Sequence, residues 1–396
     1  MAAADERTII RPERRALLCC ARVDLDGASR EELRSIVAGG IDLHRLVREA
    51  RREGLVPLVC RHVRELVPGG DHSDIVRDLE SEARANVLTS LTAAGELAAV
   101  SSALQRLGVC AIAIKGPVSA TLCYGDLGLR TFGDLDLLIS PSELPAAWSY
   151  LEGQGYAPRF ALSPASRARL LRSDSQLAFS SADGLRRIDL HWSLLPQGHT
   201  FTPGNDGPFA RRSAIRLGAT EVPTLSLEAT LLFLLLHGMK HQWEGLLWLA
   251  DVAELIRRHP ALNWSEVMSW SAHPGRKRLI DVSLALVHDL LDAPVPEWVL
   301  ARGRADGAVA TIAEALARKL LLPASDRHPW LPNTIFGLQY LFAMERARDR
   351  VRFLHDVLLR PTPLEWEALP LPPALSPLYY LVRPMRLFWK YARVTR

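Results

Sequence analysis

The stretch FGDLDLLI, residues Phe132–Ile139, places two carboxylates two positions apart where an apolar run begins, and we expect that run to be a buried strand. Alternate residues of a strand share a face, so Asp134 and Asp136 would point the same way, a few ångströms apart. Two like charges so close are costly to bury without a cation between them. The pair is a candidate metal clamp, although a loop-ending Asp134 and a solvated Asp136 at the strand edge would give the same pattern.

A third carboxylate lies inside a later apolar run, where residues 187–191 read RIDLH. A carboxylate in mid-strand is unfavourable unless it has a partner. If this strand is a neighbour of the strand after Asp134, Asp189 joins Asp134 and Asp136 at one point. Three oxygen ligands suit Mg²⁺ or Mn²⁺, which keep coordination positions open for water and phosphate.

A glycine turn precedes the aspartates. The apolar run 109–114 ends at Lys115-Gly116, and Pro117 stands at the first position of the helix that we expect next. A strand, a glycine and a helix N-terminus offer backbone N–H groups and a positive dipole to a phosphate. Lys115, one of only five lysines among 48 basic residues, would add a compact positive charge. Arg130, on the loop before Asp134, would either bind phosphate or pin that loop to a carboxylate, and the sequence leaves both roles open.

In this order the motifs resemble the nucleotidyltransferase fold of the DNA polymerase beta superfamily. More narrowly, they resemble an uncharacterised bacterial nucleotidyltransferase family often associated with peptide natural-product clusters. The resemblance covers residues 109–192 and rests on Ile114-Lys115-Gly116, Leu129-Arg130, the aspartate pair and DLHW at 189–192. It implies catalysis and metal binding by Asp134, Asp136 and Asp189, and nucleotide binding by Lys115, Gly116, Ser119 and Arg130.

One departure concerns the Gly-Ser turn that superfamily members commonly carry about ten residues before the first aspartate. In this chain Gly116 is followed by Pro117 and lies 18 residues upstream (134 − 116), so Ser119 is the residue expected to replace that serine. Proline lacks an N–H group and removes one phosphate donor. The resemblance implies nothing about the substrate, because the superfamily modifies nucleic acids, proteins and small molecules.

Histidines and a lysine further along are expected to line the cleft. His237 and His241 are four residues apart on one helix face, within a segment that resembles the downstream helical signature of the family. The zinc-protease pattern is missing its glutamate, because Gly238 stands in that position. We expect His237, Lys240 and His241 near the nucleotide, with His191 on the face of Asp189; structural hydrogen bonds or ion pairs would explain the same residues.

The periodicity predicts an α+β fold, a small mixed β-sheet nucleotidyltransferase core flanked by helical N-terminal and C-terminal regions. We expect a helical region over 1–107, the α/β core over 108–225, a helical domain over 226–360, and a proline-rich linker with a basic-aromatic helix over 361–396. That last helix would contact a partner or a membrane surface, or dock on its own domain.

The length, composition, net charge and missing motifs of the chain limit the classes of protein to which it can belong. A chain of 396 residues, 48% of them hydrophobic, is long enough for two or three modules, and its net charge of +4 suits an anionic small ligand without demanding nucleic acid. No secretory signal and no apolar run near the roughly 20 residues of a membrane span is evident, so we expect a cytoplasmic protein without a transmembrane segment. P-loop, Rossmann, serine-hydrolase and protein-kinase motifs are missing from the sequence.

Together these observations predict an enzyme, a nucleotidyltransferase that uses Mg²⁺ or Mn²⁺ and a nucleoside triphosphate as co-substrate. It would move a nucleoside monophosphate group to a hydroxyl of an unknown small molecule, peptide or RNA. Two alternatives stay open. One is a non-catalytic accessory protein that retains the fold, for example in natural-product peptide biosynthesis, and the other is a toxin-like enzyme that modifies RNA.

Overall fold

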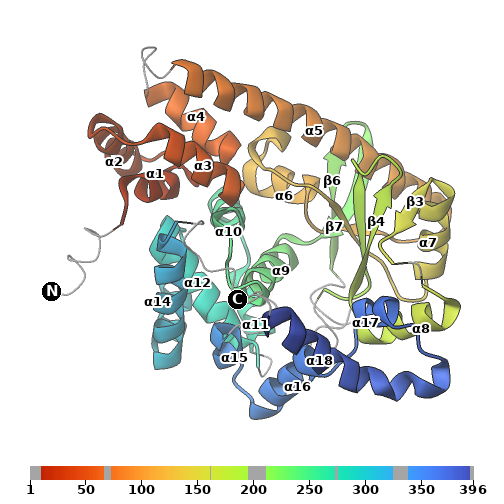
Figure 1. Ribbon diagram of the computed structural model, residues 1–396. Coiled ribbons are helices and arrows are strands. Elements are labelled where there is room, and N and C mark those ends of the chain that lie inside the picture. Colours follow the sequence, from red (N-terminus) through yellow and green to blue (C-terminus); the bar gives the residue numbers. More distant parts are fainter. Residues whose placement is uncertain are drawn as a thin grey trace.

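The computed structural model describes residues 10–66, 73–160, 162–194, 211–272, 275–323 and 338–392. Within these ranges a mixed seven-stranded sheet lies beside two groups of helices, which confirms the predicted α+β class (Figure 1). The strand order is β3-β4-β5-β2-β1-β7-β6. The strands are β1 Ile112–Ala113, β2 Leu135–Leu138, β3 Tyr156–Pro158, β4 Gln176–Ser181, β5 Arg187–His191, β6 Arg212–Leu217 and β7 Thr220–Leu225.

The centre of the sheet brings distant segments together. β2 pairs in parallel with β5 and antiparallel with β1, and β1 pairs in parallel with β7. Residues 214–224, which the sequence predicts as one strand or a crossing segment, instead belong to the antiparallel hairpin β6–β7. Its turn contains Gly218 with φ +60°, a conformation that glycine adopts without a steric penalty.

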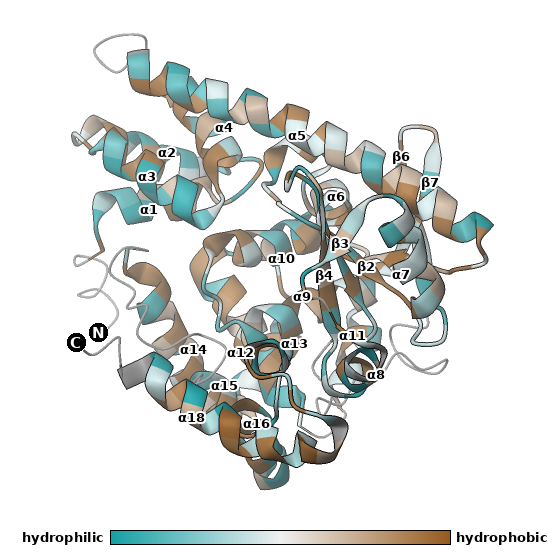
Figure 2. Ribbon diagram, turned by 45° about the vertical axis from the view of Figure 1, so that its right-hand side comes forward, coloured by the Kyte–Doolittle hydropathy of each residue, from teal (hydrophilic) through white to brown (hydrophobic). Residues whose placement is uncertain are grey.

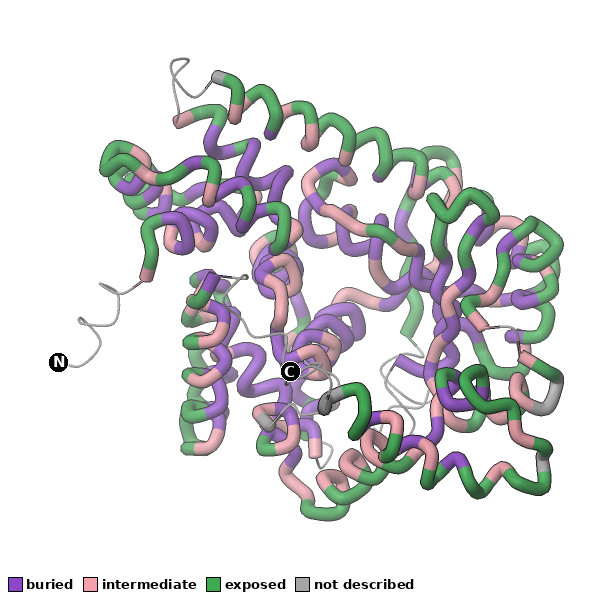
Figure 3. Tube along the Cα trace, viewed as in Figure 1, coloured by how far each residue is buried: buried purple, intermediate pink, exposed green. Residues whose placement is uncertain are grey.

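A first group of helices precedes the sheet, and within the described ranges only its last helix packs against the strands (Figure 1). The helices of this group are α1 Pro12–Cys20, which the sequence pattern does not predict, α2 Gly27–Ala38, α3 Leu43–Glu53, α4 Val56–Leu66 and α5 Ser73–Arg106. The long helix α5 packs against α4 and β7 and keeps its outer side exposed (Figure 3). Over Asp74–Arg106 it is long and apolar enough to cross a membrane, which the sequence analysis did not anticipate. This is weak evidence for a span, because core helices of soluble proteins meet the same criterion.

Shorter helices connect the strands. α6 Pro117–Ser119 continues directly as a π-helix over Ala120–Tyr124, a 3₁₀ turn follows at Leu127–Leu129, and α7 Leu144–Gly153 and α8 Pro164–Ser173 come after β2 and β3. Single π-helical turns are rare and occur mainly beside functional sites. This one lies between the Lys115-Gly116 turn and the aspartate strand.

The second helical group follows β7. It contains α9 Leu227–Lys240, α10 Leu246–Arg258, α11 Trp264–Ser271, α12 Lys277–Leu291, α13 Glu297–Arg304, α14 Gly307–Leu321, α15 Leu338–Ala343 and α16 Ala347–Leu358. The apolar spacing of the sequence predicts one helix over 334–358, whereas the described part of that range, from residue 338 onward, forms two helices, α15 and α16.

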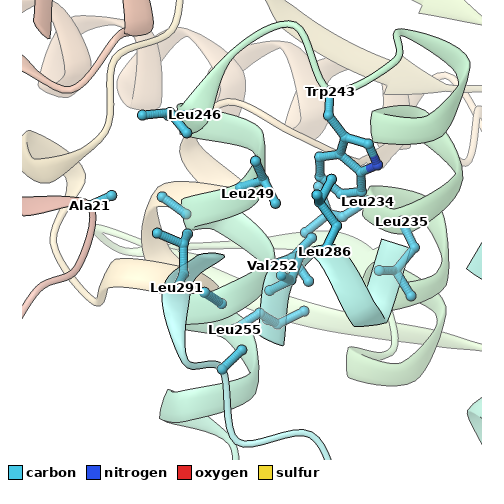
Figure 4. Close-up of a cluster of buried hydrophobic side chains, with 14 of the residues drawn as sticks. Ala21, Leu234, Leu235, Trp243, Leu246, Leu249, Val252, Leu255, Leu286 and Leu291 are labelled. Atoms are coloured by element: carbon cyan, nitrogen blue, oxygen red, sulfur yellow. The ribbon is translucent and has the colours of Figure 1, made fainter. Parts of the chain in front are cut away.

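One hydrophobic core joins both helical groups. Side chains of α9 and α10 pack with α12 and with Ala21 from the first helical group (Figure 4). Both helices are strongly hydrophobic in Figure 2 and buried in Figure 3. A second core lies between the sheet, α7 and the end of α5. The division into four parts expected from the sequence stays a prediction.

The proline-rich segment is not the extended linker that the sequence predicts. It contains α17 Pro363–Ala368 and a 3₁₀ helix over Pro373–Leu378, and α18 Tyr379–Ala392 follows. Pro363 sits at the first turn of α17, where a missing N–H costs nothing, and Thr362 and Glu365 cap that turn reciprocally. Proline at the first turn thus begins both α17 and the 3₁₀ helix.

Helix α18 docks on its own chain along one side. Arg383 and Arg386 both pair with the buried carboxylate of Glu365 on α17. The hydroxyl of Tyr379 donates to the Leu369 carbonyl at 2.8 Å. Its other side leaves Leu381, Met385, Phe388 and Trp389 more than 60% exposed.

Candidate active site

Two buried carboxylates face each other across the central strands. In the parallel pair β2–β5, Asp136 is the register partner of Asp189, and Leu138 is the partner of His191. Both aspartates are buried, at 3% and 2% exposure. The sequence predicts this convergence only on the condition that the two strands are neighbours, and they are.

The Asp136 carboxylate has two cationic or potentially cationic partners. The Lys115 Nζ atom lies 2.9 Å from Asp136 Oδ1, and His191 Nε2 lies 2.8 Å from the same oxygen. Burial alone would raise the pKa of Asp136, but Lys115 and His191 outweigh it and hold that pKa below its usual range. Asp136 is therefore an ionised carboxylate at neutral pH.

Asp189 is held by its own strand and by β4. Arg187 donates from Nε to Oδ1 at 3.0 Å and from Nη2 to Oδ2 at 3.2 Å, and Gln176 Nε2 donates to Oδ2 at 3.2 Å. Such hydrogen bonds fix the orientation of the carboxylate. The sequence analysis did not identify Gln176 or Arg187, and only the alternation of β4 and β5 could have indicated them.

The donor atoms fit a divalent cation. One ligand atom each of Asp136, Asp189 and His191 lie within 4.8 Å of one another. Two carboxylates suit Mg²⁺ or Mn²⁺, and the imidazole is a ligand that Mn²⁺ accepts more readily than Mg²⁺. The structure thus brings together two of the three predicted metal ligands, with His191 as the third member of the group in place of Asp134.

Asp134 lies just before β2 and is only half-buried. Burial raises its pKa, and the neighbouring Asp136 carboxylate raises it further, while Lys115 lowers it. It therefore belongs to the same electrostatic environment without being part of the compact group of donor atoms. A ligand role for Asp134 stays a prediction.

Gly116 occupies a conformation that excludes side chains. Its φ is +58° and its ψ is −122°, and a Cβ atom there would lie 3.1 Å from the Asp134 carbonyl oxygen. The turn after Lys115 therefore passes directly beside the aspartate loop, and only glycine permits this approach. Ser119, two positions into the following helix, is fully buried, and its hydroxyl has no hydrogen-bond partner among the described residues.

Arg130 is buried against a carboxylate from the second helical group. Its Nε donates to Asp251 Oδ1 at 2.8 Å, and its Nη2 donates to Oδ2 at 2.7 Å. The Tyr124 hydroxyl donates to the same Oδ1 at 2.9 Å. In this geometry Arg130 pins the loop before the aspartates to α10, which is one of the two roles that the sequence leaves open.

The end of α9 lies near the Lys115 side of the site. The rings of His237 and His241 are 4.7 Å apart, and Trp248 contacts both. Burial lowers the pKa of His237 well below its usual value and the pKa of His241 to about 3, and Lys115 adds to both shifts. Both imidazoles are therefore neutral at physiological pH.

Lys240 faces a carboxylate that the sequence analysis did not identify. Burial and, to a lesser extent, Lys115 lower the pKa of Lys240 to about 8, while Asp174 opposes the shift. Asp174 follows α8, its own pKa is raised by burial, and its carbonyl accepts the indole N–H of Trp192 at 2.8 Å. Lys240 and the two histidines thus lie on the Lys115 side of the site, and of these four residues only Lys115 contacts Asp136.

Comparisons with known proteins agree in part with this geometry. No curated protein matches the chain. The crystal structure of an antigenic nucleotidyltransferase-like protein from Paracoccidioides brasiliensis is similar over 51% of this chain and 93% of that chain, at 16% identity and a TM-score of 0.32, and it carries no argument here. A family model described as uncharacterised nucleotidyltransferase matches residues 39–292, which is well over half of the chain and includes every residue of the site. The chain therefore belongs to this family of uncharacterised nucleotidyltransferases.

Proposed function

We propose that this protein is a metal-dependent enzyme that moves a nucleoside monophosphate group from a nucleoside triphosphate to a hydroxyl acceptor. The observation that supports this most is the register pairing of Asp136 with Asp189, next to His191, in a chain of a nucleotidyltransferase family. Paired buried carboxylates with an imidazole at this spacing suit a divalent cation that binds phosphate oxygens.

Mg²⁺ or Mn²⁺ would be held by Asp136 and Asp189, with Asp134 and His191 beside them. When bound, the ion would neutralise charge on the phosphates and lower the pKa of an acceptor hydroxyl. Asp189 serves either as a ligand or as the base that accepts the hydroxyl proton. The acceptor oxygen forms a bond to the α-phosphorus, the bond from that phosphorus to its bridging oxygen breaks, and pyrophosphate leaves.

Lys115 is the residue best placed to bind the phosphates. Its side chain is 18% exposed, so the ammonium group is accessible while it pairs with Asp136. In the resting protein this pair compensates the buried carboxylate, and with nucleotide bound Lys115 exchanges that contact for a phosphate oxygen. The Gly116 backbone adds a surface on which a phosphate can approach closely.

Titration calorimetry with each nucleoside triphosphate tests binding, with and without Mg²⁺. We expect Mg²⁺-dependent binding of at least one nucleotide, and at least tenfold weaker binding in Lys115→Ala, because the variant loses a phosphate-binding charge. Arg212→Ala, at the far strand β6, is the matched control. A protein that binds no nucleotide under any of these conditions would favour the non-catalytic alternative.

A further inference from the structure

A cavity lies where α8 meets the C-terminal segment, with α17 and α8 side by side in Figure 1. Its volume is about 320 Å³. None of the described residues that line it is acidic, and the lining includes three arginines and three aromatic residues: Arg169, Arg172, Arg360, Trp366, Tyr379 and Tyr380. Such a lining favours a ligand with negative charge.

The aromatic side chains give the cavity flat surfaces. The Arg169 guanidinium lies over the Trp366 ring at 5.6 Å and over the Tyr379 ring at 5.7 Å. The indole N–H of Trp366 is buried and has no acceptor among the described residues. An arginine stacked on two rings combines charge with an apolar face, which suits a ligand that carries both an anionic group and a flat ring.

Among the arginines that line the cavity, Arg172 has the positive charge that is most available to a ligand anion. It is exposed and makes no ion pair within the described part of the chain. Arg360, in contrast, donates to Asp356 at 3.2 Å and to the Ser173 carbonyl at 3.4 Å. A ligand anion at Arg172 would therefore gain a partner without breaking an existing pair.

A short segment connects this cavity to the catalytic carboxylates. Ser173 lines the cavity, and three residues further on Gln176 donates to Asp189. Three extended residues span at most roughly 10 Å. Between them, Asp174 lies close enough to Lys240 and Arg360 for both to lower its pKa. The cavity and the residue that binds the Asp189 carboxylate are thus joined by the short α8–β4 turn.

We propose that this cavity is the acceptor site of the enzyme, and that the acceptor is a small organic anion with a flat ring and a hydroxyl group. The inference rests on the proposed function. The anion, a carboxylate or a phosphate, binds Arg172 and Arg169, the ring lies against Trp366 and Tyr379, and the hydroxyl extends past Ser173 toward Asp189. The volume is at the lower end of that of ligand sites, which fits one small molecule better than a nucleic-acid strand.

The test uses the full chain and simple probes in ligand-observed NMR titrations. Phenyl phosphate and benzoate carry the ring with either anion, benzyl alcohol carries the ring without charge, and inorganic phosphate carries the charge without a ring. We expect phenyl phosphate or benzoate to bind at least tenfold more tightly than the other two probes, and the better of them identifies the anion.

Variants assign the binding to the cavity. We expect Arg172→Ala to weaken binding of the preferred probe at least tenfold, and Arg169→Ala to do the same if its melting temperature shows that it folds. Arg167→Ala is the matched control, because Arg167 is on the same helix but pairs with Glu152 and stacks on Trp148. Equal affinity in wild type and Arg172→Ala, or equal binding of benzyl alcohol, would overturn the proposal, as would Arg172-dependent binding of polyuridylate without binding of either anion.

The outcomes separate this proposal from the proposed function. We expect Arg172→Ala to keep the Mg²⁺-dependent nucleotide affinity of the wild type and to lose transfer to the acceptor. Unchanged transfer in Arg172→Ala would overturn the acceptor site while leaving the transferase function standing. Absence of nucleotide binding in the wild type would contradict the function itself.

Discussion

Lys115 Nζ and His191 Nε2 meet at the same oxygen of Asp136, at 2.9 and 2.8 Å. One residue lies in the turn between β1 and α6 and the other at the end of β5, so three separate segments converge on one carboxylate. A buried carboxylate is stable only when it is paired or hydrogen-bonded. Asp136 is thus held as an ionised acid by two side chains, which a metal ion and a phosphate would replace in the proposed function.

The close approach of the glycine turn to the aspartate loop means that two glycine substitutions should differ in their effects on stability and nucleotide binding. We expect Gly116→Ala to lower the free energy of unfolding by about 1–3 kcal/mol and to weaken nucleotide binding, because its φ is +58° and its Cβ would press on the Asp134 carbonyl. Gly133→Ala is the control, since a Cβ there meets nothing within 4 Å. Urea unfolding and calorimetry measure both effects, and equal behaviour of the two variants would refute the close approach.

Because Arg130 and Asp251 form a buried pair, we expect the effects of replacing the two residues on the free energy of unfolding to be non-additive. Arg130→Met should destabilise the protein by about 3–5 kcal/mol, because it leaves the Asp251 carboxylate, at 0% exposure, without its cation. We expect the double variant Arg130→Met/Asp251→Leu to recover most of that loss. Thermal and urea unfolding of wild type, of the single variants Arg130→Met and Asp251→Leu, and of the double variant measure the coupling. Additive losses in the double variant would mean that the two side chains do not act as a pair.

At one glycine of helix α9, we expect an added side chain to clash with a neighbouring aromatic ring. A Cβ on Gly238 would lie 2.5 Å from the Trp243 ring, and both residues are buried. We expect Gly238→Ala to destabilise the protein by about 1–3 kcal/mol or more. In the control Gly95→Ala, on the exposed side of α5 with nothing within 4 Å, the better helix propensity of alanine should stabilise by about 0.5–1 kcal/mol. We therefore expect Gly238→Ala to lower the free energy of unfolding and Gly95→Ala to raise it. If both variants were more stable than wild type, Trp243 would not cover Gly238.

We expect the removal of the Lys240 charge to stabilise the protein by an amount that depends on pH. Its pKa is about 8 in the folded chain and near 10.5 when unfolded, so between these values the unfolded chain binds more protons and stability rises with pH. Below pH 8 the buried Lys240 is charged, and the full free-energy cost of burying this charge lowers the stability of the folded chain. We therefore expect Lys240→Met to raise the free energy of unfolding by about 1–3 kcal/mol at pH 7 and by less at pH 9.5. Urea unfolding at both pH values measures this, and an equal gain at both would contradict the shift.

Much of the core fold can be predicted from the sequence because its signals are local. The apolar run after Asp134 and the isolated carboxylate in RIDLH identify β2 and β5, and the two strands do pair. The glycine turn after Lys115 is visible for the same reason. In contrast, the split of residues 214–224 into β6 and β7 depends on a single glycine turn inside one short apolar stretch.

The parts of the site that depend on distant contacts could not be predicted. Arg130 meets Asp251 across 121 positions of the chain, so the sequence cannot choose between phosphate and carboxylate as its partner. Asp174 lies between α8 and β4, and Gln176 is the first residue of β4. Neither belongs to a motif, and their roles follow from tertiary packing. The proline-rich segment is misread as a linker because proline both starts helices and ends them, and only the capping by Thr362 and Glu365 shows which applies.

The most direct test of the central claim is transfer of label from α-phosphate-labelled nucleoside triphosphates to acceptors in a cell extract. It compares wild type with Asp136→Asn, with Asp189→Asn, and with Asp183→Asn in the exposed hairpin turn as the control. Asparagine keeps the shape but not the charge, so melting temperatures should confirm that each variant folds. We expect labelled product from wild type and Asp183→Asn and a loss of at least a hundredfold in the other two variants. Undiminished transfer by folded Asp136→Asn would contradict the account.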